Sequence, residues 1–151
     1  MSQQIVREAT SKDADILAAF NIKMAYETEH KTLDPDMIHA GVLKLFEEPD
    51  LGFYTVVEVE GEIAGALMIT TEWSDWRNGL FWWIQSVYIL PEYRRLGVFT
   101  RLYQHIRNQA RQDPDVCGLR LYVEKENTRA RQTYLKAGME ETEYRLYEEE
   151  F

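Results

Sequence analysis

Cysteine is nearly absent from this sequence, because Cys117 is the single one among 151 residues. A lone cysteine excludes an intrachain disulfide. Its neighbours Val116, Leu119 and Leu121 are apolar, and no histidine adjoins it, so we expect a buried small residue rather than a catalytic thiol. The cysteine and the three histidines also lack the spacing of metal ligands, so the sequence predicts no metal site.

Long apolar runs and positive charge are also scarce. No stretch is long enough to cross a membrane. Residues 1–4, Met-Ser-Gln-Gln, lack the apolar core of a signal peptide, so we expect a cytoplasmic protein. The 17 Lys and Arg residues are outnumbered by 26 Asp and Glu, which gives a formal net charge of -9. This balance disfavours nucleic acid and anionic membranes as partners and favours a cationic substrate.

What is present is the composition of a soluble globular protein, with 45% apolar and 28% charged residues. We expect one domain spanning residues 1–151. Residue periodicity predicts the order β-α-α-β-β-β-α-β-α-β, an α/β fold whose mixed sheet has helices on both faces. The expected strands are residues 5–9, 52–59, 63–71, 80–90, 116–123 and 142–148, and the expected helices are residues 10–29, 35–48, 98–112 and 127–137.

Three local signals support this order. Asp34 followed by Pro35 is typical of a helix start. Residues 80–90 are apolar on both alternating faces, which is typical of a central strand covered on both sides. The segment from Glu72 to Gly79 is expected to be a loop that carries two tryptophans.

Residues 87–100, VYILPEYRRLGVFT, combine the end of a strand, a basic turn and the start of a helix. Pro91 ends the strand because it lacks the N–H that a sheet requires. The N–H groups of the helix start point to one place, which the helix dipole and the side chains of Arg94 and Arg95 make positive. The stretch therefore predicts a phosphate or pyrophosphate site. No lysine with serine or threonine follows Gly97, which excludes a P-loop.

Two motifs together resemble the GNAT N-acetyltransferase superfamily. The first is the loop pattern Gln/Arg-x-x-Gly-x-Gly/Ala, which Arg94 and Gly97 match and Phe99 does not. Because such a loop acts through its backbone, it can tolerate a Phe99 side chain that points away from it and finds room under the sheet. The second is Asn-x-x-Ala-x-x-x-Tyr-x-x-x-Gly-Phe, matched throughout residues 127–139 except that Met139 replaces the phenylalanine.

The resemblance implies that acetyl-CoA binds as co-substrate in a splayed gap beside the central strand. It implies a helix-capping Asn127 that also contacts the pantetheine arm, and a Tyr134 that anchors or protonates the leaving thiolate. The residues implied along the pantetheine are Val87, Tyr88 and Ile89. Those implied at the pyrophosphate are Arg94 or Arg95 through a side chain, and Arg95, Leu96, Gly97, Val98, Phe99 and Thr100 through the backbone.

The predicted reaction is acetyl transfer to a primary amine, by direct attack in a ternary complex. We expect a small-molecule acceptor and take Glu72 as the first candidate for the base. Aromatic and acidic side chains suit an ammonium group. The residues expected around the acceptor are Glu27, Glu29, Trp73, Asp75, Trp76 and Gln85.

Other interpretations stay open at this level. The acceptor is alternatively a protein N-terminus or lysine. The chain is alternatively a non-catalytic module that senses acyl-CoA, or an adapter that uses its tryptophan loop for protein contacts. Many members of the superfamily are dimers, and the last expected strand offers an edge for pairing with a second copy, so a homodimer is a further expectation.

Overall fold

The computed structural model describes residues 3–151, which fall into two compact units, residues 3–121 and 122–151. Met1 and Ser2, on which the prediction about a signal peptide partly rests, lie outside the described residues. The larger unit carries a five-stranded sheet and three α-helices, and the smaller unit carries one α-helix. Their bounds are β1 (Gln4–Glu8), α1 (Ala14–Glu29), α2 (Pro35–Glu47), β2 (Gly52–Val59), β3 (Glu62–Ser74), β4 (Gly79–Ile89), α3 (Val98–Gln112), β5 (Val116–Arg120) and α4 (Thr128–Lys136).

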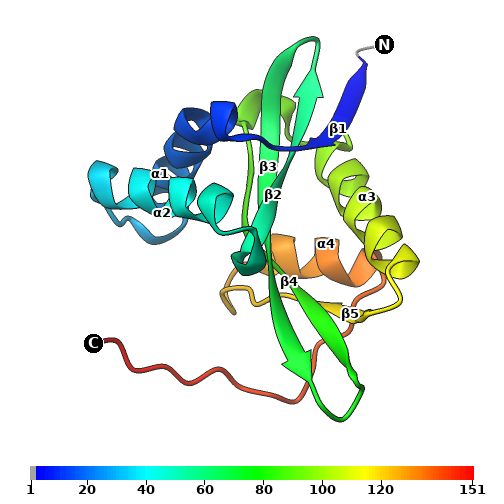
Figure 1. Ribbon diagram of the computed structural model, residues 1–151. Coiled ribbons are helices and arrows are strands. Elements are labelled where there is room, and N and C mark those ends of the chain that lie inside the picture. Colours follow the sequence, from blue (N-terminus) through cyan, green and yellow to red (C-terminus); the bar gives the residue numbers. More distant parts are fainter. Residues whose placement is uncertain (1–2) are drawn as a thin grey trace. The chain divides into compact units, whose positions relative to one another are not determined.

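The sheet follows the chain in the order β1-β2-β3-β4-β5. Neighbouring strands are antiparallel up to β4, and β5 joins β4 in parallel through the crossover helix α3. In the larger unit, α1 and α2 lie together on one side of the sheet and α3 lies on the other (Figure 1). The mixed sheet and its helices on both faces confirm the predicted fold class.

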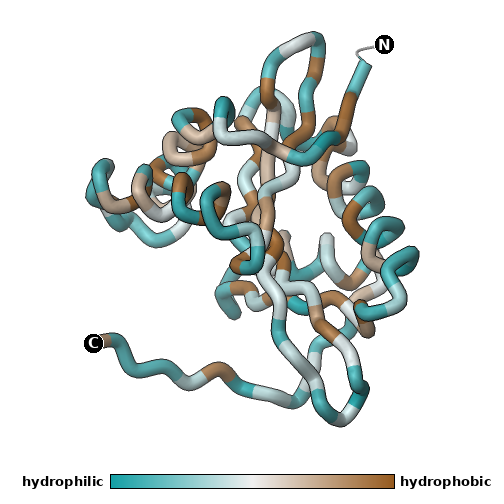
Figure 2. The backbone as a smooth tube through the Cα atoms, in the orientation of Figure 1, coloured by the Kyte–Doolittle hydropathy of each residue, from teal (hydrophilic) through white to brown (hydrophobic). Residues whose placement is uncertain are grey.

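The core has one layer on each face of the sheet. Facing α1 and α2, Phe20 packs on Tyr88 with ring centroids 5.2 Å apart, and Val56 is fully buried beside them. Helix α3 covers the other face with Leu102 and Ile106, both fully buried. In Figure 2 the central strands are largely apolar, whereas the C-terminal segment is mostly hydrophilic.

Helix α2 begins where the sequence predicts, because the Asp34 carboxylate accepts hydrogen bonds from the backbone N–H groups of Asp36 and Met37 at 2.9 and 3.4 Å. Pro35 occupies the first helical position, where no intrahelical N–H is needed. Local capping chemistry alone therefore fixes this helix start.

The prediction of a last strand at residues 142–148 is wrong, because none of the described residues after Arg120 is in a strand. Tyr144 and Leu146 alternate as a strand would, but a strand also needs a neighbour for its N–H and C=O groups. Both side chains are exposed. Residue preference without a pairing partner leaves this segment extended and unpaired.

Two smaller expectations also differ from the structure. Cys117 is exposed, not buried, because β5 is an edge strand and its apolar neighbours in sequence do not cover the thiol. The loop expected from Glu72 to Gly79 is shorter, because β3 continues to Ser74, which pairs with Gly79. Asn78, with a left-handed φ of 49°, helps to close the remaining tight turn.

Candidate active site

The central strand β4 loses its neighbour on one side halfway along its length. The parallel ladder with β5 ends where Trp83 pairs with Arg120, while the ladder with β3 continues to Ile89. Over the described residues, no strand pairs with the β5-facing edge of residues 84–89. This edge offers N–H and C=O groups to an extended ligand, as an incomplete sheet does.

A β-bulge lies at the start of this open edge. Ala66 pairs with Tyr88 and Met68 with Gln85, so Ser86 and Val87 together face the single residue between them on β3. Ser86 has a left-handed φ of 53°, which costs a non-glycine residue about 1–2 kcal/mol. A bulge bends its strand and increases the local twist, so it helps to turn the end of β4 away from β5.

The loop after β4 leads directly to the start of α3. Arg95 and Gly97 have φ values of 68° and 77°, and Gly97 stands at the N-cap without a side chain to bond the first turn. A Cβ placed on Gly97 would meet no atom within 4 Å, so the space above the loop is open. Open space beside the N–H groups of a helix start fits a phosphate or pyrophosphate group.

Phe99 does not obstruct this loop. Its ring lies along α3 beside the ring of Tyr103, one helical turn later, with centroids 6.1 Å apart. In this position the ring packs along the helix, which is compatible with a loop that acts through its backbone.

The two arginines of the loop differ in their surroundings. The Arg94 Nε donates to the carbonyl oxygen of Ile89 at 2.8 Å, and its Nη2 lies 3.0 Å from a carboxylate oxygen of Glu27. Arg95 is exposed, and its side chain has no hydrogen-bond or ion-pair partner among residues 3–151. Of the two, Arg95 is the one whose guanidinium is available to a phosphate.

Comparison with known proteins decides the family. The family model described as "Acetyltransferase (GNAT) family" matches residues 15–139. The chain belongs to the GNAT acetyltransferase family. No protein with a curated description matches the sequence.

Solved structures with the GNAT fold agree over almost the whole chain. A possible acetyltransferase from Clostridium difficile 630 is 46% identical, with a TM-score of 0.92 over 98% of this chain and 97% of that one. A predicted acetyltransferase with acetyl-CoA from Clostridium acetobutylicum is 19% identical, with a TM-score of 0.78 over 97% of this chain and 96% of that one. Glucosamine-6-phosphate N-acetyltransferase from Arabidopsis thaliana is 17% identical, with a TM-score of 0.72 over 97% of this chain and 98% of that one.

Glu72, the predicted base of this GNAT protein, is held by Trp83 and Arg120, away from the open edge of β4. Its carboxylate accepts hydrogen bonds of 2.9 Å each from Trp83 Nε1 and from Arg120. These two bonds, the tryptophan's first, lower the pKa of Glu72. Glu72 pairs with Phe81, which lies about 20 Å along β4 from Val87 at the usual rise per residue. Glu72 is therefore stabilised as an anion and lies far along the sheet from Val87, and its role as the base stays a prediction.

The remaining residues predicted around the acceptor do not gather in one place. Trp73 and Trp76 are 59% and 88% exposed, and with Asp75 they lie at the β3–β4 hairpin tip, about 20 Å along β4 from the bulge. Gln85 lies at the bulge and donates to Thr70 Oγ1 at 2.6 Å.

Glu27 and Glu29 belong to the last turn of α1. Glu27 contacts Arg94 beside the open edge of β4, whereas Glu29 is exposed and pairs with Lys31 at 3.4 Å. The pair between Glu27 and Arg94 is 67 residues apart in sequence, and no sequence signal predicted it.

The smaller unit carries the second GNAT motif on α4. Asn127 Oδ1 accepts from the Ala130 N–H at 3.1 Å, which confirms its helix-capping role. Burial raises the pKa of Tyr134, and its phenol is protonated at neutral pH, as that of an ordinary tyrosine also is. A protonated phenol is the form that can act as an acid.

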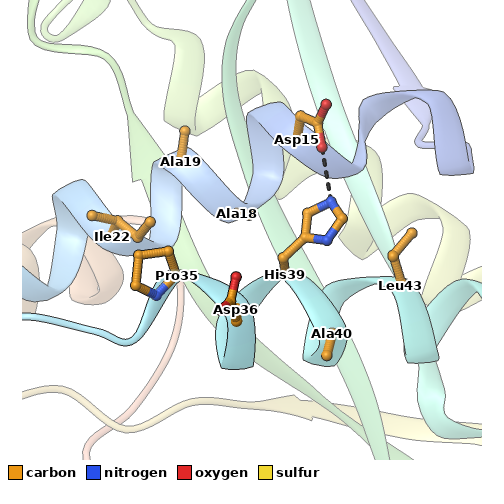
Figure 3. A pocket seen from close by; sticks show the side chains of 9 residues that line it. All are labelled: Asp15, Ala18, Ala19, Ile22, Pro35, Asp36, His39, Ala40 and Leu43. Carbon is orange, nitrogen blue, oxygen red and sulfur yellow. Dashed lines mark hydrogen bonds and ion pairs between the residues drawn. The ribbon is translucent and has the colours of Figure 1, made fainter.

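A shallow groove of about 430 Å³ runs along the surface between α1 and α2 (Figure 3). Across the groove, His39 Nε2 of α2 lies 2.8 Å from Asp15 Oδ1 of α1. Ala18, Ala19 and Ala40 are among the residues that line the groove. None of the predicted site residues lines this groove.

The described part of the chain lacks both a metal-binding cluster and a membrane-spanning helix. Residues 3–151 contain no cluster of three or more His, Cys, Asp or Glu side chains able to hold a metal ion. None of the helices described is long and apolar enough to cross a membrane.

Proposed function

We propose that this GNAT protein uses acetyl-CoA to acetylate a primary amine of a small molecule. The observation that carries the proposal is the open edge of β4, residues 84–89, followed at once by the loop with Gly97 at a bare helix N-cap. The open edge suits the amide-rich pantetheine arm, and the helix start suits the pyrophosphate.

The residues proposed to hold acetyl-CoA follow from this arrangement. Val87, Tyr88 and Ile89 bond the pantetheine through their backbone, and the loop backbone from Arg95 to Thr100 holds the pyrophosphate, assisted by the Arg95 side chain. Asn127 contacts the pantetheine arm in addition to capping α4.

The chemistry proposed for the chain is acyl transfer within a ternary complex. A neutral amine forms a C–N bond to the acetyl carbon and gives a tetrahedral oxyanion, from which the C–S bond then breaks and CoA leaves as the thiolate. A backbone N–H of β4, at or near Ile89, stabilises the negative charge that develops on the acetyl oxygen. Tyr134, whose phenol is protonated at neutral pH, gives its proton to the departing thiolate. The proton lost by the amine leaves through water, for which Gln85 at the bulge is a fitting hydrogen-bond partner.

Charge favours an acceptor that carries an ammonium group, and we keep the small-molecule class that the sequence predicts. The net charge of -9 favours a cationic ligand, and Glu27 presents a carboxylate beside the end of β4. GNAT structures similar to this chain include an enzyme named for a sugar phosphate and one named for a ribosomal protein, so the fold alone does not decide.

The proposal is tested by calorimetric titration with acetyl-CoA and by turnover on a panel of primary amines. We expect acetyl-CoA binding and release of CoA with at least one amine. Tyr134→Phe should lower kcat by about 100-fold while binding stays within about twofold. Tyr144→Phe, an exposed tyrosine of the same unit, is the matched control and should change neither. Binding without turnover would favour an acyl-CoA sensor, and failure to bind would favour an adapter.

We also propose a homodimer. The C-terminal segment exposes Tyr144, Leu146 and Tyr147, and the outer edge of β5 has no strand partner among the described residues. Pairing of that segment with the β5 edge of a second copy would cover the exposed side chains and give the unpaired N–H and C=O groups of β5 hydrogen-bond partners. Light scattering of the full chain should give twice the monomer mass, and a monomer at all concentrations would contradict this.

A further inference from the structure

Among residues 3–151, the Arg94 side chain contacts β4 and α1 and not the backbone of the phosphate-binding loop. Its Nε donates to the Ile89 carbonyl at 2.8 Å, and its Nη2 reaches both carboxylate oxygens of Glu27, at 3.0 and 3.4 Å. Its guanidinium also lies over the Tyr88 ring, 5.4 Å from the centroid. One planar group thus ties the end of β4 to the last turn of α1, as a guanidinium with several fixed donors can.

The buried Tyr88 lies beside this pair, under the Arg94 guanidinium. Tyr88 is 5% exposed, and its pKa is raised first by burial and then by the nearby Glu27 carboxylate. A carboxylate that accepts from one guanidinium still has lone pairs unused, since it has about four acceptor sites. The Glu27 side chain is 38% exposed, so part of the carboxylate remains accessible to a ligand.

Glu27 lies beside the open edge of β4, where the acetyl group of the bound cofactor is proposed to lie. Tyr88 and Ile89, the two β4 residues tied to the cluster, belong to the open edge where the pantetheine is proposed to lie. An anionic group fixed beside that edge is suited to holding an ammonium group until the amine loses its proton. Without Arg94, Glu27 would be a long flexible side chain at a helix end, which loses rotamer entropy when it binds a ligand.

We propose that Arg94, which lies over the Tyr88 ring, is a positioning residue that orients Glu27 as the carboxylate that binds the acceptor's ammonium group. Arg94 is then not a ligand of the CoA phosphates, and Arg95 is the arginine left for that role. The proposal rests on the proposed acetyltransferase function and names a residue for the acceptor side of the same site.

The test compares Glu27→Gln, Arg94→Lys and the double variant with the wild type. CoA affinity is measured by calorimetry, and KM and kcat are measured for the best primary amine of the panel. If no amine turns over, the probe is the amine with the largest thermal shift in the presence of CoA. Glu48→Gln is the matched control, because this exposed glutamate pairs with Lys44 on α2 at 3.9 Å.

We expect Glu27→Gln and Arg94→Lys each to raise the amine KM by about tenfold or more, with kcat and CoA affinity nearly unchanged. Lysine keeps the charge but cannot bond Ile89 and Glu27 together, so it should not rescue. The double variant should be no worse than the single ones, because both act through one carboxylate. Glu27→Asp should restore part of the affinity for the amine.

If Arg94 instead binds a CoA phosphate, the two variants should change the affinity for CoA, and in opposite directions. Arg94→Lys would then weaken CoA binding, and Glu27→Gln would strengthen it by releasing the guanidinium, and either result overturns the proposal. So does an unchanged amine KM, or CoA binding without a response to any amine. A wild type that fails to bind CoA instead refutes the proposed function itself.

Discussion

Replacing Asp13 by asparagine should destabilise the protein strongly at neutral pH. Asp13 lies between β1 and α1 and is only 7% exposed. Its carboxylate accepts from Arg7 Nη1 and Nη2 at 2.9 and 3.1 Å and from the Thr10 N–H at 2.9 Å. Asparagine keeps the shape, but it removes the charge and turns an amide NH₂ or a neutral oxygen toward the guanidinium.

The expected magnitude follows from these contacts. A hydrogen bond to a charged group contributes about 1.5–3 kcal/mol, and breaking a buried ion pair costs about 3–5 kcal/mol. Arg7 keeps its second partner, Glu58, at 2.8 Å, so the variant does not leave an isolated buried charge. We therefore expect a loss of about 2–3 kcal/mol, which lowers Tm by about 5–10 °C for a chain of this size.

The pH dependence of this loss has a definite sign. The hydrogen bonds from Arg7 lower the pKa of Asp13 below its unfolded value, against the opposing effect of burial. A group with a lowered folded pKa stabilises the fold above its unfolded pKa of about 3.9, and this stabilisation is lost as the pH falls through the folded pKa. The difference between wild type and Asp13→Asn should therefore shrink below about pH 4.

Urea unfolding at a series of pH values from 7 to 3 measures this difference. Asp15→Asn is the matched control, because its side chain is 91% exposed and pairs only with His39 at the surface. The control should cost less than about 1 kcal/mol. A pH-independent difference for Asp13→Asn, or a loss no larger than that of the control, would refute the reasoning.

Three further predictions concern single positions in the larger unit. Gly97→Ala should cost about 1 kcal/mol in urea unfolding, because a φ of 77° is unfavourable for alanine although the space is open, and unchanged stability would contradict this. Cys117 should react with a thiol reagent in the native protein, one equivalent per chain, and a requirement for denaturant would contradict its exposure. Glu72→Gln should leave kcat within about threefold while it lowers Tm, because its partners are Trp83 and Arg120, whereas a loss of about 100-fold in kcat would restore it as the base.

The parts of the fold that depend on neighbouring residues were predictable from sequence. Asp34 and Pro35 define a helix start by local hydrogen bonds, and Gly97 defines another by its backbone freedom. The stretch from Val87 to Thr100 predicted a strand, a turn and a helix that the structure contains. Each of these signals acts within a few residues, so no knowledge of the tertiary fold was required.

What depends on distant residues was not predictable. Glu27 and Arg94 meet only because α1 packs across the sheet to reach the end of β4, and a sequence pattern carries no information about that contact. Glu72 looked suitable as a base by its place at a strand end, but the register of β3 and β4 puts it far from Val87. The expected last strand failed for the same reason, since pairing is decided by an available partner.

The uneven pairing of β4 divides the strand into two regions of different backbone protection. Up to Trp83, amide groups on both edges are held by neighbouring strands, so their hydrogen exchange should require a large opening of the sheet. Beyond Trp83, only the edge toward β3 is held in this way, and amides on alternate residues should exchange faster. A ligand that lies along this edge would act as a sixth strand, and the slowing of these few amides would map its path residue by residue.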